Sequence, residues 1–238
     1  MGDLLEFSFM AETFFDMLHF VPVTLFLTFT SMVLAIGIGL LSALVIVKEI
    51  PVLRQLVAIY ILLGRATPTM VMLYLVYFGL PIFLMAFTNQ TGIDTGFQHI
   101  PPMLFAIVAL TLHTGAYLAE IFRSAFLSVE NGQMEAALSV GMTWFQGFYR
   151  IILKQAALFA LPLMANEFLG LLKNTSVVFT ITVVELLGGA KIACAENYRY
   201  LETYLVVALI YWGISLSFER CFLLLEKRIG FFRRGAEL

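Results

Sequence analysis

The chain has 238 residues, of which 61% are hydrophobic and only 13% are charged, and its mean hydropathy is +0.94. Soluble domains carry about 25% charged residues, so this composition excludes an ordinary soluble protein and places the chain in a lipid bilayer. The formal net charge of -2 and the absence of a basic reading face give no sign of nucleic-acid binding.

Hydrophobic stretches predict an all-α integral membrane protein with about five transmembrane helices. A helix needs roughly 20 residues to cross about 30 Å of hydrocarbon, and five stretches meet or approach this length: 20–47, 55–81, 101–126, 156–172 and 203–225. A shorter apolar run at 177–187 is interpreted as a re-entrant or interfacial segment. In the first span, Gly37 and Gly39 permit close helix packing.

The distribution of Lys and Arg predicts the orientation. Neither residue occurs before Lys48 or in the loop 88–100, whereas the first, third and fifth spans are followed by several. Because positively charged flanks stay in the cytoplasm, we expect the N-terminus outside and the C-terminus inside. The expected parts are an extracytoplasmic segment 1–19, a transmembrane domain 20–228 and a cytoplasmic tail 229–238. The acidic start argues against a cleavable signal peptide.

The most polar long stretch is the loop at about 128–155, which this topology places in the cytoplasm. Asn131 fits the N-cap of a short helix, Gly141 can end that helix in a left-handed conformation, and Thr143 with Gln146 forms a capping-box pattern. The pattern predicts a helix, a glycine and a second helix. Such helices either lie on the bilayer surface or insert apolar side chains into a groove of a cytosolic partner.

The loop sequence "EAALSVGMTWFQGFYRIILK" resembles the cytoplasmic signature of ABC importer membrane subunits. Lys154 replaces the proline that ends the signature, so the second helix is expected to run more smoothly into the fourth span. The stretches "GRATPTMVMLYLVYFGLP", "LPLMANEFLGLLKNTSV" and "YLVVALIYW" extend the resemblance to permeases for polar amino acids. The matching loop residues are Glu135, Ala136, Ala137, Gly141, Ile151 and Leu153.

The resemblance implies the transmembrane domain of an ABC type I importer in a bacterial inner or plasma membrane. The loop would be a coupling helix that docks on a separate ATP-binding subunit, with Glu135 at the docking rim and Gly141 setting the angle between the helices. The chain itself would be no enzyme and would need no cofactor or metal, since ATP and Mg²⁺ would bind the partner. Further implied partners are a second, preferably identical permease chain, an extracytoplasmic substrate-binding protein and a polar amino acid.

Ionisable residues within spans are functional hypotheses because they are costly in hydrocarbon. On the third span, His113, Tyr117, Glu120 and Ser124 share one helical face. An amino-acid zwitterion needs an anion for its ammonium group and a cation, amide or hydroxyl for its carboxylate. We assign Glu120 or Glu167 to the ammonium side, and Asn166, Lys173 and Thr175 to the carboxylate or polar side. The predicted substrate path is Tyr117, Glu120, Asn166, Glu167, Lys173, Thr175 and Ser176.

Each of these assignments has a structural alternative. Glu120 could pair with Arg123 or Arg65, Asn166 could bond a neighbouring helix, and Lys173 could extend to the membrane interface. Arg65 is expected to stabilise a helix break at Pro68 rather than to touch substrate. Two other functions compete. An ion-coupled secondary transporter would use the carboxylates for a cation, and an intramembrane hydrolase would need a nucleophile beside His113.

Overall fold

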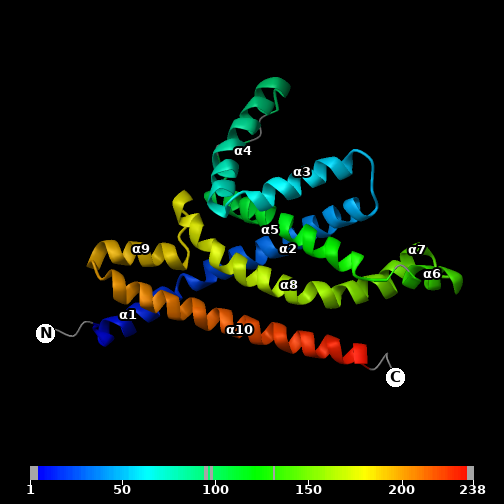
Figure 1. Cartoon of the computed structure of the whole chain (residues 1–238). Helices are drawn as coiled ribbons and strands as arrows, with labels where there is room; N and C mark the ends of the chain where they lie inside the picture. The colour runs from blue at the N-terminus through cyan, green and yellow to red at the C-terminus, as the bar shows by residue number, and fades with distance from the viewer. Residues whose placement is uncertain (1–4, 94–95, 97–98, 131, 235–238) are drawn as a thin grey trace.

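The computed structural model describes residues 5–93, 96, 99–130 and 132–234, and the regular elements in this part are all helices (Figure 1). Five of its helical stretches are long and apolar enough to cross a membrane. They are α2 (Val21–Val47), α4 (Thr69–Thr91), α5 (Pro102–Leu127), the stretch Trp144–Ile181 around α8 (Leu153–Asn174), and the first 29 residues of α10 (Tyr200–Arg234). The predicted all-α membrane fold is confirmed.

The second predicted span, 55–81, is wrong in its bounds. The structure divides this region into α3 (Leu53–Ala66) and α4, and it is α4 that has the length and hydropathy of a span. Proline lacks a backbone N–H and restricts the residue before it to an extended conformation. Thr67 accordingly has φ -94° and ψ 127°, directly before Pro68. The predicted break at Pro68 is therefore present, whereas Pro81 lies inside α4 without ending it.

Helix α5 is the centre of the molecule, and it packs most extensively against α2. Their close approach requires glycine at residue 39, because a Cβ there would lie 2.7 Å from the Cβ of Leu118. Gly64 of α3 meets Ala116 in the same way, at 2.5 Å. Small residues allow helices in lipid to approach each other's backbone. The prediction holds for Gly39, whereas Gly37 faces open space.

The N-terminal segment contains a helix that was not expected from its sequence. This helix, α1 (Phe7–Leu18), runs beside the first part of α10 (Figure 1). An ion pair between Glu6 and Arg199 joins the two elements, and the Arg199 guanidinium lies 4.7 Å from the ring centroid of Phe9. The extracytoplasmic location of residues 1–19 stays a prediction.

The apolar run 177–187 contains the end of a 3₁₀ helix and the start of the following α-helix. A 3₁₀ helix, η3 (Thr175–Ile181), ends at Thr182 with φ +70°, and α9 (Leu186–Asn197) follows. Val178, Ile181 and Leu186 are buried within the bundle. This burial contradicts the interfacial interpretation, because an interfacial segment exposes one face to lipid headgroups. A re-entrant segment remains the prediction for this run.

Candidate functional site

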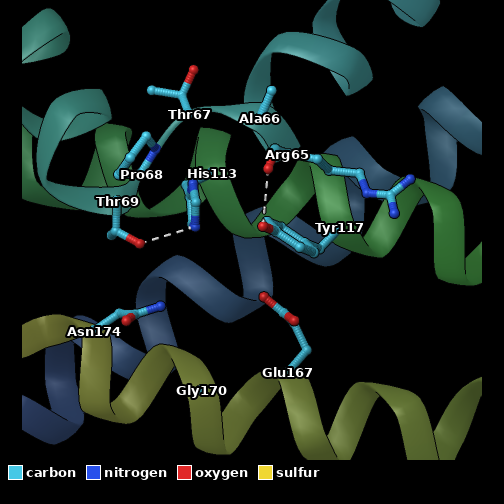
Figure 2. A pocket seen from close by; sticks show the side chains of 10 residues that line it. All are labelled: Arg65, Ala66, Thr67, Pro68, Thr69, His113, Tyr117, Glu167, Gly170 and Asn174. Carbon is cyan, nitrogen blue, oxygen red and sulfur yellow. Dashed lines mark hydrogen bonds between the residues drawn. The ribbon is translucent and has the colours of Figure 1, made fainter.

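A polar cavity of about 410 Å³ lies at the break between α3 and α4, where α5 and α8 also meet. Figure 2 shows side chains entering it from both sides, with Thr69, His113 and Tyr117 facing Glu167 and Asn174 of α8. Unwound backbone at membrane depth is tolerated where it lines such a cavity. The lining residues are Arg65, Ala66, Thr67, Pro68, Thr69, His113, Tyr117, Glu167, Gly170 and Asn174.

Helix α5 holds the break open by hydrogen bonds. Where α3 ends, the carbonyl of Arg65 has no helical donor, and the hydroxyl of Tyr117 donates to it at 3.1 Å. On the other side of Pro68, the hydroxyl of Thr69 lies 3.0 Å from Nε2 of His113. The break is thus anchored to α5 on both sides by side chains one helical turn apart. Polar groups of this kind are expensive in lipid and indicate function.

The cavity is lined by one negatively charged and one positively charged residue. Glu167 is half-buried, and its carboxylate makes no ion pair or hydrogen bond within the described part of the chain. Arg65 likewise has no ion pair there, and its guanidinium lies 5.8 Å from the ring centroid of Tyr117. A carboxylate without a cation is costly at membrane depth. The two groups therefore leave places for a ligand cation and a ligand anion.

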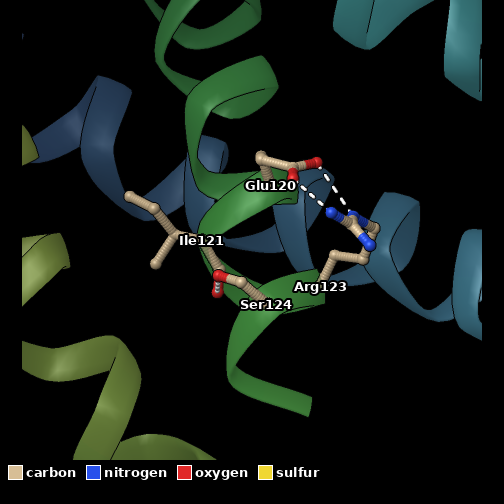
Figure 3. Close-up of polar contacts among 4 residues, drawn as sticks. All are labelled: Glu120, Ile121, Arg123 and Ser124. Atoms are coloured by element: carbon tan, nitrogen blue, oxygen red, sulfur yellow. Dashed lines mark hydrogen bonds and ion pairs between the residues drawn. The ribbon is translucent and has the colours of Figure 1, made fainter. Parts of the chain in front are cut away.

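The predicted Glu120 lies outside this cavity and is held by Arg123 (Figure 3). The Nε of Arg123 donates to its carboxylate at 2.9 Å, and Nη2 makes a second contact. Ser124 also turns back to its own helix and donates to the carbonyl of Ile121 at 2.9 Å. The alternative interpretation of Glu120, an ion pair with Arg123, is what the geometry shows.

The remaining predicted path residues divide into two groups. Tyr117 and Glu167 line the cavity. Asn166 and Lys173 are exposed, Ser176 is half-buried, and Thr175 is buried and donates to the carbonyl of Leu172 at 2.8 Å. None of these four lines the cavity, and their role in the substrate path stays a prediction.

Thr69, Gly170 and Asn174 line the cavity although the sequence pattern did not predict them, and Arg65, which was expected only at the helix break, lines it as well. A signal for the first of these was available in "GRATPT", because a helix that breaks within the membrane places its ends beside a cavity. Asn174 was harder to predict, because the polar stripe predicted on α8 contained Asn166 and Lys173 instead. Asn166 and Lys173 are exposed and do not line the cavity.

The polar loop has the predicted helix, glycine, helix order. Helix α6 (Gly132–Ser139) is followed by Gly141 at φ +83°, and α7 (Trp144–Gly147) begins with a capping box in which Thr143 and Gln146 exchange hydrogen bonds. Asn131, the predicted N-cap, lies outside the described residues. From α7 the chain continues through a π-helical turn, η2 (Phe148–Ile152), into α8. The second loop helix therefore runs into the fourth span without a break, as predicted, and the helix is wider at the π turn.

Side chains of the loop divide into a packed set and an exposed set. Ala137 is buried against Gly147, while Ile151 and Leu153 are half-buried on the bundle core. Glu135 and Ala136 are exposed. The loop also exposes large apolar side chains, of which Val140 at 73%, Phe145 at 70% and Tyr149 at 61% are the most exposed. Exposed aromatic residues next to charged ones are typical of interfaces with another protein.

The loop contacts the end of α2 through one aromatic residue. The ammonium group of Lys48 lies 3.9 Å from the ring centroid of Trp144, whose other neighbour is the parallel ring of Phe148 at 5.0 Å. Lys48 directly follows the last residue of α2. A cation over a tryptophan face contributes about 0.5–2 kcal/mol. The contact connects the exposed loop to the helix that packs most closely on α5.

Comparison with known proteins identifies the family. Residues 35–231 match the family described as binding-protein-dependent transport system inner membrane component. The chain belongs to this family. It is accordingly a multi-pass protein of the inner membrane, as its five apolar helices also indicate.

Two relatives of this inner-membrane component illustrate the similarity. The probable amino-acid permease protein YxeN of Bacillus subtilis is 42% identical over 215 residues, which cover 90% of this chain and 92% of the relative. The L-cystine transport system permease protein TcyL of the same organism is 37% identical, covering 88% and 85%. Both names describe permease proteins.

Solved structures agree with the fold. A crystal structure of an amino acid ABC transporter with histidines superposes with a TM-score of 0.79 at 32% identity, covering 95% of this inner-membrane component and 100% of that chain. A chain of the MetNI methionine ABC transporter in an inward-facing conformation gives a TM-score of 0.70 at 18% identity, covering 90% and 96%. These neighbours identify the fold as that of an ABC type I importer transmembrane domain.

Proposed function

We propose that this inner-membrane component is the permease subunit of an ATP-driven import system for amino acids. It would form the path across the membrane, while a separate subunit binds and hydrolyses ATP with Mg²⁺. The chain itself would contribute no catalytic residue and hold no cofactor. Amino-acid transporters among the relatives and structural neighbours support the substrate class.

The observation that carries the proposal is the exposed loop between α5 and α8. Its capping box, its left-handed glycine and its packing of Ala137 on Gly147 build a defined surface that the bundle core does not use. Val140, Phe145 and Tyr149 on that surface fit an apolar groove in another subunit, with Glu135 beside them. The continuous stretch Trp144–Ile181 then leads from the loop to Glu167 and Asn174 in the cavity.

The cavity supplies the second half of the mechanism. A zwitterion brings an ammonium group and a carboxylate, and these suit the unpaired Glu167 and Arg65. Transport requires that the cavity open to one side of the membrane in one state and to the other side in a second state. ATP can drive this exchange only if the partner subunit contacts the loop differently in the two states.

The proposed assembly contains further chains. Two copies of this permease, two ATP-binding subunits and an extracytoplasmic substrate-binding protein would form the importer. We prefer identical permease chains because this chain carries both the loop and the cavity residues. The predicted orientation, with the N-terminus outside, places the loop beside the ATP-binding subunits and the end of α4 toward the binding protein.

The test is uptake of labelled amino acids into proteoliposomes that contain the permease, its ATP-binding subunit and its binding protein. We expect uptake to need ATP on the side of the loop and to be lost when Glu135→Lys reverses the charge on the loop. The matched control is Glu226→Lys, which makes the same change on the predicted cytoplasmic part of α10, outside the loop. This control is expected to transport normally.

Two results would contradict the proposal. Uptake that proceeds without ATP and follows an ion gradient would indicate a secondary transporter. Equal uptake by Glu135→Lys and wild type, at equal amounts of assembled complex, would remove the loop from the mechanism.

A further inference from the structure

The cavity has a charged end and a neutral end. In Figure 2, Arg65 and Glu167 lie toward the Tyr117 end, whereas Asn174 lies toward the end formed by Thr69 and His113. Glu167 and Asn174 are seven residues apart on α8, which at 1.5 Å per residue corresponds to about 10 Å along the helix axis. Gly170 lies between them and places no side chain in the space. The separation is comparable with the length of an amino acid of medium size.

The charges that line the cavity cancel. Glu167 contributes one negative charge and Arg65 one positive charge. The nearby Glu120 and Arg123 neutralise each other and do not line the cavity, and Lys173 is exposed outside it. Once the α-ammonium and α-carboxylate groups of a substrate have met Glu167 and Arg65, the lining contains no further charge for a substrate side chain.

The neutral end offers hydrogen bonds instead. The amide of Asn174 makes no side-chain hydrogen bond within the described part of the chain, so both its donor and its acceptor are available. Across from it, the hydroxyl of Thr69 and the Nε2 of His113 already share one bond of 3.0 Å. Asn174 is therefore the group best able to bond a neutral polar side chain.

We infer that this permease accepts amino acids whose side chain is neutral and forms hydrogen bonds, and that Asn174 determines this specificity. The inference rests on the proposed function and names the substrate class that the cavity selects. A charged side chain would lie here at membrane depth without a counter-ion, which is costly. An apolar side chain would leave the amide of Asn174 unpaired, and sites built for hydrogen bonds reject such analogues strongly.

The experiment measures equilibrium binding to the assembled permease and ATP-binding subunits in nanodiscs, without the substrate-binding protein. Omitting that protein removes its own selectivity from the measurement. The probes are labelled glutamine, its near-isostere glutamate, lysine and leucine. We expect glutamine to bind at least roughly tenfold more tightly than the other three, because a hydrogen bond or a paired charge is lost in each of them.

Substitution of Asn174 then tests its role. Asn174→Asp adds a carboxylate to the neutral end and is expected to shift the preference from glutamine toward lysine by roughly tenfold. The control Asn197→Asp makes the same chemical change at an exposed residue that ends α9, and it is expected to keep the wild-type ranking. Asn174→Ser provides a second variant without charge, which should weaken glutamine binding without favouring lysine.

Several outcomes would overturn the inference. One is tighter binding of glutamate or lysine than of glutamine by the wild type, and another is an unchanged ranking in Asn174→Asp. A shift of equal size in Asn197→Asp would also contradict it, because the effect would then be electrostatic at long range. These outcomes leave the proposed function intact if ATP-dependent uptake of any amino acid is observed. Absence of such uptake would contradict the proposed function itself.

Discussion

Helix α5 has two unlike faces, one that packs closely on neighbouring helices and one that borders a cavity able to hold a ligand. Toward α2 and α3 it presents Leu118 and Ala116, against which Gly39 and Gly64 pack so closely that an added Cβ would clash. Toward the helix break and α8 it presents His113 and Tyr117, which line a polar cavity. Small apolar residues allow two helices to pack closely, whereas polar residues that bond the backbone of a broken helix leave a cavity beside it.

The largest effect is expected on the cavity side. Glu167→Gln removes the carboxylate but keeps the size of the side chain, and we expect amino-acid uptake to fall roughly 100-fold or more, since breaking a buried charge pair costs about 2–5 kcal/mol. Initial uptake rates in proteoliposomes measure this loss. The control Glu196→Gln changes an exposed carboxylate on α9 and should have wild-type rates. Equal rates for the two variants would contradict the role of Glu167.

A substitution in the contact between α2 and α5 should lower the stability of the protein rather than change which amino acid is taken up. Gly39→Val introduces a Cβ at the position that lies 2.7 Å from Leu118, and we expect destabilisation by about 1–3 kcal/mol, as for other overpacked cores. The unfolding temperature of the purified complex measures it. Gly37→Val, two residues away, faces open space and should change this temperature little. Similar losses in both variants would mean that the α2–α5 contact is not specially tight.

The connection between the loop and the packed side gives a smaller expected effect. Lys48→Met removes the cation over Trp144, and a cation–π contact contributes about 0.5–2 kcal/mol. We expect the amount of amino acid transported per ATP hydrolysed to fall several-fold, because the loop would move more independently of α2. Lys48→Arg keeps a cation and should restore the ratio. An unchanged ratio in Lys48→Met would show that force reaches the cavity through α8 alone.

The smallest effect lies outside both faces of α5, where α1 joins α10. The hydrogen bond from Arg199, its charge and a hydrogen bond from Ser8 hold the pKa of Glu6 below its ordinary value of 4.5. A lowered folded-state pKa means that the contact stabilises α1 above pH 4.5 and is lost as the pH falls through the folded pKa.

Hydrogen exchange of the α1 amides across this pH range measures the contact. We expect faster exchange in α1 at the acid end, with little change in α5. Glu6→Gln should remove the pH dependence, whereas Glu12→Gln, an exposed carboxylate on the same helix, should keep it. Acid-induced exchange of equal size in Glu6→Gln would exclude the Glu6–Arg199 pair as its cause.

Local patterns predicted the elements that depend on neighbouring residues. The hydropathy that predicts α2, α5 and α10 depends only on the residues of each helix. The capping box at Thr143 and Gln146 likewise lies within four residues. The left-handed Gly141 followed from the same local chemistry. Helix α1 was not predicted from the sequence, because Glu12 and Asp16 within it and Glu6 directly before it obscure the apolar face that packs on α10.

The candidate site was predicted less completely, because a helical stripe shows which residues share a face but not which neighbour that face meets. On α5 the stripe from His113 to Ser124 was correctly aligned, yet only its first two members reach the cavity. Glu120 finds Arg123 one turn away on its own helix instead. On α8 the face with Glu167 and Asn174, rather than the face with Asn166 and Lys173, meets the helix break.

Composition, hydropathy and the local patterns of the loop alone thus establish a membrane protein with about five spans and a polar loop of two short helices joined at a glycine, since these properties depend on transfer free energy and short-range hydrogen bonds. Only the tertiary structure decided where the second span lies and which polar side chains share a cavity. Pro68 splits that region into α3 and α4, and α5 holds the break through Tyr117 and His113. These contacts join residues 44 and 52 positions apart, and the sequence does not record which distant helices come together.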